Sequence, residues 1–150
     1  MIHPATGGCE IYTSLANALA PNFSCYGIDS YNLYNENKID NLHQLAKYYL
    51  TYIGEIMANT NQKVYHMLGW SLGGEIALEI ACLLEQQSNA KIKVYLLDSV
   101  LNDDYLVSLD TPIYMETIKN EYRNYCIAQG YDKSYLEKAI LNMEVESKLS

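Results

Sequence analysis

Apolar and polar positions follow two periods along the chain, one typical of helices and the other typical of buried strands. The helical period, with apolar residues three and four positions apart, covers residues 9–20, about 41–58 and 75–87. Short apolar and aromatic runs predict strands at residues 23–28, 63–68 and 91–97, and loops are expected at 4–8 and 30–37. Because strands that alternate with helices form right-handed βαβ units, the pattern predicts an α/β fold with a parallel sheet.

The chain changes character after residue 97, since only helical periodicity follows. Thr111 and Pro112 suit the cap and the first position of a helix that Gly130 ends, and a last helix is expected over about residues 133–145. We therefore divide the chain into a partial α/β core, residues 1–102, and a helical region, residues 103–150.

Charge and composition exclude several classes of partner. Ten Lys and Arg against 18 Asp and Glu leave a formal net charge of −8, which disfavours nucleic acids and anionic membranes because both bind basic patches. No apolar run approaches the roughly 20 residues of a membrane span, and the amino terminus has no secretory signal pattern. The four cysteines form no metal-binding or redox pair, so we expect a cytoplasmic protein without a metal ion.

The sharpest chemical signal is Gly-Trp-Ser-Leu-Gly-Gly at residues 69–74. It contains the G-x-S-x-G pattern directly after an expected strand and directly before an expected helix, which is the context of a nucleophile elbow. In such an elbow a tight, strained turn lifts the serine hydroxyl clear of the sheet. Ser71 is therefore the candidate nucleophile.

Acyl transfer by a serine also needs two backbone N–H groups directed at the developing oxyanion. One comes from the residue after the nucleophile, here Leu72, and the other from a loop after an earlier strand. The glycine-containing loop His-Pro-Ala-Thr-Gly-Gly at residues 3–8 suits this role, with Ala5 as the donor.

The candidate acid is Asp98, which ends the strand that follows the elbow helix. Parallel sheets collect their functional groups at the carboxyl ends of the strands. An aspartate at the end of a strand also serves as a turn former or helix cap. The rivals Asp103, Asp104 and Asp110 lie further into the helical region.

Three motifs together resemble the thioesterase domains of nonribosomal peptide and polyketide synthases. They are residues 3–8, residues 69–74 and Leu-Leu-Asp-Ser at residues 96–99, in that family's order and roughly its spacing. The resemblance implies an α/β-hydrolase fold in which residues 103–150 contain a helical lid. It also implies that Ser71 is the nucleophile, Asp98 the acid, and Ala5 and Leu72 the oxyanion donors. Such an enzyme releases an acyl or peptidyl chain from the phosphopantetheine arm of a carrier domain, without a metal ion or organic cofactor.

The chain departs from the family's pattern at two points. The triad order in this fold is Ser, acid, His, yet the three histidines (His3, His43 and His66) all precede Asp98. Of the central strand that precedes the loop at residues 3–8, only Met1 and Ile2 remain. We therefore expect an internal fragment of a thioesterase domain, incomplete at both ends and inactive alone, from an enzymatically active parent.

Two alternatives stay open at this point. One is a free-standing editing thioesterase that clears misprimed carrier domains by the same chemistry. The other is a non-catalytic remnant that docks carrier domains and lacks the triad histidine.

Overall fold

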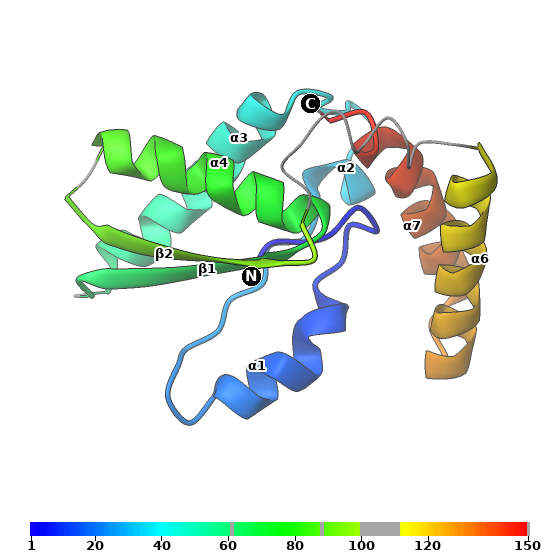
Figure 1. The fold of residues 1–150 in the computed structure, drawn as a ribbon, viewed down its shortest axis with the longest axis horizontal. Helices are drawn as coiled ribbons and strands as arrows, with labels where there is room; N and C mark the ends of the chain where they lie inside the picture. Colours follow the sequence, from blue (N-terminus) through cyan, green and yellow to red (C-terminus); the bar gives the residue numbers. More distant parts are fainter. Residues whose placement is uncertain (61, 88, 100–111, 150) are drawn as a thin grey trace.

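The structure, a computed structural model, describes residues 1–60, 62–87, 89–99 and 112–149 (Figure 1). A short sheet lies under two long helices, and a pair of helices stands beside this core. In chain order the elements are the 3₁₀ turn η1 (Glu10–Tyr12), α1 (Thr13–Leu19), α2 (Tyr31–Tyr34), α3 (Leu42–Ala58), β1 (Val64–Trp70), α4 (Leu72–Gln87), β2 (Lys91–Leu97), α6 (Pro112–Gln129) and α7 (Lys133–Glu146).

The sheet is parallel, as the alternation of elements predicted. β1 and β2 pair along their whole length. On the other side of β1, Ile2 forms parallel bridges to both Gly69 and Ile28. Ile2 therefore occupies the position expected for the central strand, between the segment at Ile28 and β1.

The strand expected at residues 23–28 is wrong. The Tyr26 carbonyl accepts from the Met1 amino group at 2.8 Å, but the segment forms no ladder beyond one isolated bridge, at Ile28. The Ile28 N–H donates to the Met1 carbonyl at 3.0 Å, and the Ile28 carbonyl accepts from the His3 N–H at 3.1 Å. The aromatic side chains that suggested a buried strand are solvent-exposed, Phe23 by 43% and Tyr26 by 52%. The apolar composition of the segment thus reflects an exposed face and not a sheet interior.

The boundaries of three other elements, α2, β1 and α4, differ from the expected ones. The expected loop at 30–37 contains the short helix α2, which Ser30 caps by accepting from the Asn32 N–H. β1 continues through Gly69 to Trp70, and α4 begins at Leu72, three residues earlier than expected. α3 begins after its cap residue Asn41, whose side chain accepts from the Gln44 N–H at 3.0 Å, close to the expected start at about residue 41.

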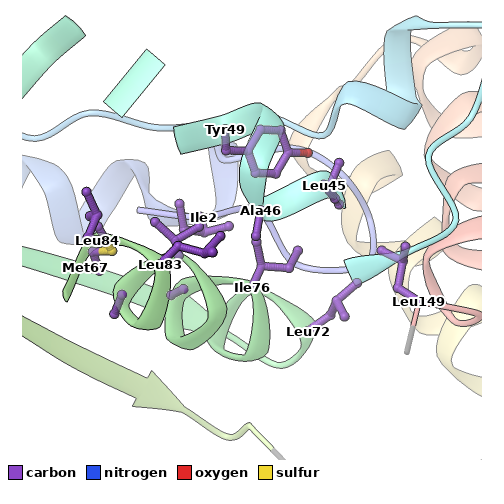
Figure 2. Close-up of a cluster of buried hydrophobic side chains, with 13 residues drawn as sticks. Ile2, Leu45, Ala46, Tyr49, Met67, Leu72, Ile76, Leu83, Leu84 and Leu149 are labelled. Atoms are coloured by element: carbon purple, nitrogen blue, oxygen red, sulfur yellow. The ribbon is translucent and has the colours of Figure 1, made fainter. Parts of the chain in front are cut away.

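The core lies between α3, α4 and the sheet. Figure 2 shows side chains of α3 and α4 meeting each other, joined by Ile2 and Met67 from the sheet and by Leu149 from the end of the chain. The buried members are Ile2, Leu45, Ala46, Tyr49, Met67, Leu72, Ile76, Ala77, Ile80, Ala81, Leu83, Leu84 and Leu149. Burial of each large apolar side chain stabilises the fold by about 2 kcal/mol, so this layer holds the start of α4 firmly.

The helices α6 and α7 stand at one end of the sheet (Figure 1). Gly130, with φ +74°, separates them as expected, and the Asp132 side chain caps α7 by accepting from the N–H groups of Ser134 and Tyr135. No helix in the described ranges is long and apolar enough to cross a bilayer.

Candidate active site

Ser71 occupies the single-residue turn between β1 and α4. Its φ of +55° is in the left-handed region that side chains other than glycine rarely adopt. Two bonds hold this conformation: the Ser71 N–H donates to the Leu97 carbonyl and the Gly74 N–H donates to the Ser71 carbonyl, each at 2.9 Å. The strand, strained turn and helix expected around Ser71 are therefore present, and its role as nucleophile stays a prediction.

Two glycines of the motif allow the start of α4 to touch both neighbouring strands. A Cβ on Gly73 would lie 2.5 Å from the Ile2 carbonyl oxygen and 2.7 Å from that of His3. A Cβ on Gly74 would overlap the Ser99 hydroxyl, just beyond β2. The elbow thus packs backbone to backbone against the segment that leads into the loop at residues 3–8.

We expect Gly73→Ala to lower the free energy of unfolding by about 2 kcal/mol, because the added methyl group overlaps backbone that cannot move aside. Gly54→Ala is the matched control. Gly54 lies within α3, and a methyl group added there would have nothing within 4 Å, so alanine is expected to stabilise by about 1 kcal/mol. Urea unfolding of both variants measures the difference, and equal stabilities would contradict the close approach.

The two expected oxyanion donors, Ala5 and Leu72, lie on either side of this contact. Leu72 is the first residue of α4, so its N–H has no intrahelical acceptor and lies at the positive end of the helix dipole. The Ala5 carbonyl accepts from the Asn142 side chain of α7 at 3.2 Å. Within the described part of the chain, no acceptor is bonded to the N–H of either donor.

Tyr12 connects the two halves of the candidate site. Its hydroxyl donates to the Ile2 carbonyl at 2.9 Å and accepts from the Trp70 N–H at 2.8 Å, so it bridges the residue before His3 to the residue before Ser71. Burial raises the pKa of Tyr12 to about 12, which keeps the donor protonated. The sequence showed Tyr12 only as one apolar position of a helix, because nothing in its spacing reveals this pairing.

Asp98 follows β2 directly and lies at the same sheet edge as Ser71. Its φ is +47°, also left-handed, and its side chain is exposed. The ends of the two strands are joined by the bond from Ser71 to Leu97 and by the Ser99 hydroxyl, which donates to the Ser71 carbonyl at 2.9 Å. The rivals Asp103, Asp104 and Asp110 lie outside the described residues.

Each of the three histidines bonds a group other than Ser71. His3 is fully buried and contacts Tyr49 and Pro4. His43 is on α3 and pairs with Glu79 of α4, while His66 of β1 bonds and stacks on Tyr95 of β2. That none of the three is the general base stays a prediction. The described residues contain no group of three or more His, Cys, Asp or Glu that could hold a metal ion.

A buried carboxyl that sequence reasoning missed joins α7 to α2 and its cap residue. Glu146 accepts from the Ser30 hydroxyl, from Asn32 at 3.2 Å and from Asn142 at 3.4 Å, all through Oε1. Its Oε2 and the Asn142 Oδ1 are buried without a partner among the described residues. Burial is the main cause that raises the pKa of Glu146, which favours the neutral acid.

We expect Glu146→Gln to raise the free energy of unfolding at pH 8 by about 1 kcal/mol, because it removes a carboxyl group whose charged form is disfavoured by burial. Glutamine keeps the acceptor and adds a donor without a buried charge. Since the folded-state pKa is raised, the stabilisation from protonation is full below the unfolded pKa and is lost as pH rises through the folded pKa. The advantage of the variant should therefore shrink on acidification.

The control for this prediction is Glu144→Gln, which removes a carboxylate from the same helix at an exposed position. Its pairing with Lys119 lowers the pKa of Glu144, so its removal should destabilise slightly at pH 8. Urea unfolding between pH 4 and pH 8 measures both variants. Lys38 and Tyr49 also face the Glu146 carboxyl, and they are unchanged in all three proteins. A less stable Glu146→Gln protein at pH 8 would contradict the argument.

Comparison with known sequences identifies related proteins. The model of the thioesterase domain family matches residues 1–102. The chain is 28% identical over 102 residues to a dimodular nonribosomal peptide synthase of Bacillus subtilis (strain 168), covering 67% of this chain and 4% of that protein. It is 32% identical over 120 residues to the polyketide synthase PksR of the same organism, covering 79% and 4%. The chain thus spans a small fraction of the curated relatives it matches.

Solved structures of a similar fold include the NocB thioesterase domain in covalent complex with a fluorophosphonate nocardicin G analog. The two share a TM-score of 0.67 and 20% identity over 99% of this chain and 64% of that chain. A second structure of the same domain has a TM-score of 0.66, with 62% of that chain covered. This likeness confirms the partial α/β fold expected from the sequence.

Proposed function

Because the chain belongs to the thioesterase domain family, as its three motifs indicated, we propose that it carries the serine chemistry of an acyl or peptidyl thioesterase. Its relatives include a nonribosomal peptide synthase and a polyketide synthase. The proposed substrate is therefore an acyl or peptidyl thioester on the phosphopantetheine arm of a carrier domain, which is the proposed partner. Residues 103–150 are assigned to the lid, and the reaction uses no metal ion or organic cofactor.

The observation that carries this proposal is the strained turn at Ser71. A serine with φ +55° costs stability, and such strain persists where the surrounding structure holds it for a purpose. Ser71 lies directly before α4, a helix whose first N–H groups attract negative charge. In a turn with no chemical role, glycine or asparagine adopts this left-handed conformation with less strain.

In the proposed reaction the Ser71 Oγ attacks the thioester carbonyl carbon and its proton passes to a general base. The oxyanion accepts hydrogen bonds from the Ala5 and Leu72 N–H groups. The C–S bond then breaks, the pantetheine thiol leaves with a proton, and an ester on Ser71 remains. Water, or a nucleophile within the acyl chain, then attacks this ester and gives up a proton to the base. The bond between the acyl group and the Ser71 Oγ breaks, the base passes that proton to Oγ, and a free acid or a macrocycle is released. Asp98 orients the base, which we assign to none of the chain's three histidines.

Acyl-enzyme formation provides the direct test. The full-length protein is mixed with a carrier domain loaded with an acyl or peptidyl thioester, and the released thiol and the intact protein mass are followed together. We expect an adduct of the acyl mass on the peptide that contains Ser71. An adduct elsewhere, or one that persists in Ser71→Ala, would reject the serine assignment.

The same assay separates the two alternatives. A free-standing editing enzyme is expected to release acetyl groups from a misprimed carrier faster than a peptidyl chain. A docking remnant is expected to bind the carrier without releasing thiol. Turnover of the peptidyl thioester with a Ser71 adduct supports the proposed function over both.

A further inference from the structure

His3 stands at the base of the loop at residues 3–8 and is completely buried. Its Nδ1 is 2.9 Å from the Pro4 carbonyl oxygen, and its Nε2 is 2.8 Å from the Tyr49 hydroxyl of α3. The two rings meet edge to face, with centroids 5.5 Å apart and planes at 88°. Both polar atoms of this buried ring are therefore bonded, each to a different part of the fold.

The hydrogen-bond partners of His3 and Tyr49 determine which of their atoms carry a hydrogen. A carbonyl oxygen only accepts, so Nδ1 of His3 carries a hydrogen and donates it to Pro4. The Tyr31 N–H donates to the Tyr49 oxygen at 2.9 Å, which leaves the Tyr49 O–H to donate to Nε2 of His3. The ring is therefore neutral, with a hydrogen on Nδ1 and a bare Nε2.

The Pro4 carbonyl belongs to the same rigid peptide unit as the Ala5 N–H. In a planar trans peptide the carbonyl and the N–H point in opposite directions, so a fixed carbonyl also fixes the N–H. The Pro4 carbonyl accepts twice, from the His3 ring and from the Gly7 N–H at 2.9 Å. The Ala5 N–H is directed away from both donors and has no acceptor among the described residues.

We propose that His3 is a positioning residue, whose neutral ring holds the Pro4 carbonyl so that the Ala5 N–H stays directed at the developing oxyanion. The Tyr49 hydroxyl keeps the ring in the required tautomer. This inference rests on the proposed function, because it gives Ala5 a role in the reaction. This role differs from simple packing of a buried histidine, because it depends on the hydrogen bond from Nδ1 to the Pro4 carbonyl and not on the bulk of the ring.

Two substitutions separate the nitrogens. Asparagine presents its amide near the position of Nδ1 and can still donate to Pro4, whereas glutamine presents its amide near Nε2 and can only reach Tyr49. We expect His3→Gln to lower kcat for an acyl-pantetheine thioester about 100-fold with KM nearly unchanged, the effect of a misdirected oxyanion donor. His3→Asn is expected to keep kcat within about 5-fold of the wild type.

The measurements use the full-length protein at a temperature below the unfolding of every variant. His66→Asn and His66→Gln are the matched controls, because His66 is an exposed histidine of β1, and both should keep the wild-type kcat. Equal losses of kcat in His3→Asn and His3→Gln would show a packing role and overturn the inference. So would wild-type kcat in His3→Gln.

A spectroscopic measurement decides the tautomer without reference to activity. In a ¹⁵N-labelled protein, the His3 ring is expected to show a protonated Nδ1 and a bare Nε2. It should remain neutral well below the usual histidine range, because burial lowers the pKa of His3 to about 4. A hydrogen on Nε2 would overturn the inference.

The proposed function and the role of His3 fail in different ways. Turnover that is absent, or that survives in Ser71→Ala, removes the proposed function together with the oxyanion role of Ala5. Turnover that depends on Ser71 but not on the choice between asparagine and glutamine at residue 3 removes only the role of His3.

Discussion

Replacement of Ser71 by alanine in the full-length protein is expected to lower kcat/KM for an acyl-pantetheine thioester by about 10⁵-fold. Without the hydroxyl no acyl-enzyme forms, and the Ala5 and Leu72 N–H groups can only stabilise slow attack by water. The loss should fall on kcat, because the groups that bind the substrate remain. Alanine keeps the backbone, so the free energy of unfolding should change little.

Ser14→Ala is the control for this prediction, since Ser14 is an exposed serine on α1. Release of free thiol, followed at matched protein concentration, measures both variants. Turnover by Ser71→Ala within about 10-fold of the wild type would show that another group is the nucleophile.

Asp98→Asn is expected to lower kcat by about 10⁴-fold while leaving the fold intact. An amide cannot stabilise the positive charge that develops on the base, and it favours the wrong tautomer. Asparagine adopts left-handed conformations at least as readily as aspartate, so the φ of +47° is retained. The variant therefore separates a catalytic carboxylate from a turn former.

Asp40→Asn serves as the control, because Asp40 is an exposed aspartate before α3. Single substitutions of the rivals Asp103, Asp104 and Asp110 by asparagine should keep most of the activity. If Asp98→Asn retains wild-type kcat while one of these variants loses it, the assignment of the acid passes to that residue.

Local chemistry explains which parts of the site could be predicted from the sequence. A glycine-rich turn between a strand and a helix is determined by residues within about six positions of each other, so Ser71 and Leu72 were identifiable from residues 69–74. The alternation of periods likewise predicted the parallel pairing of β1 with β2. Asp98 followed from the rule that parallel strands end at one edge of the sheet.

Contacts between distant segments were decided by the tertiary structure alone. The His3 ring bonds Tyr49, 46 positions further along the chain, and Glu146 bonds Ser30, 116 positions before it. Hydrophobic periodicity does not predict contacts between residues so far apart in the sequence. The strand expected at residues 23–28 was wrong because a strand forms only where a neighbouring segment supplies hydrogen bonds along it. The segment next to residues 23–28 forms a bridge with it at Ile28 alone. The sequence alone determined the local turns of this protein and the residue types that those turns carry. Its tertiary structure decided which buried polar groups hold those turns in place, because such groups are stable only when the whole fold supplies their partners.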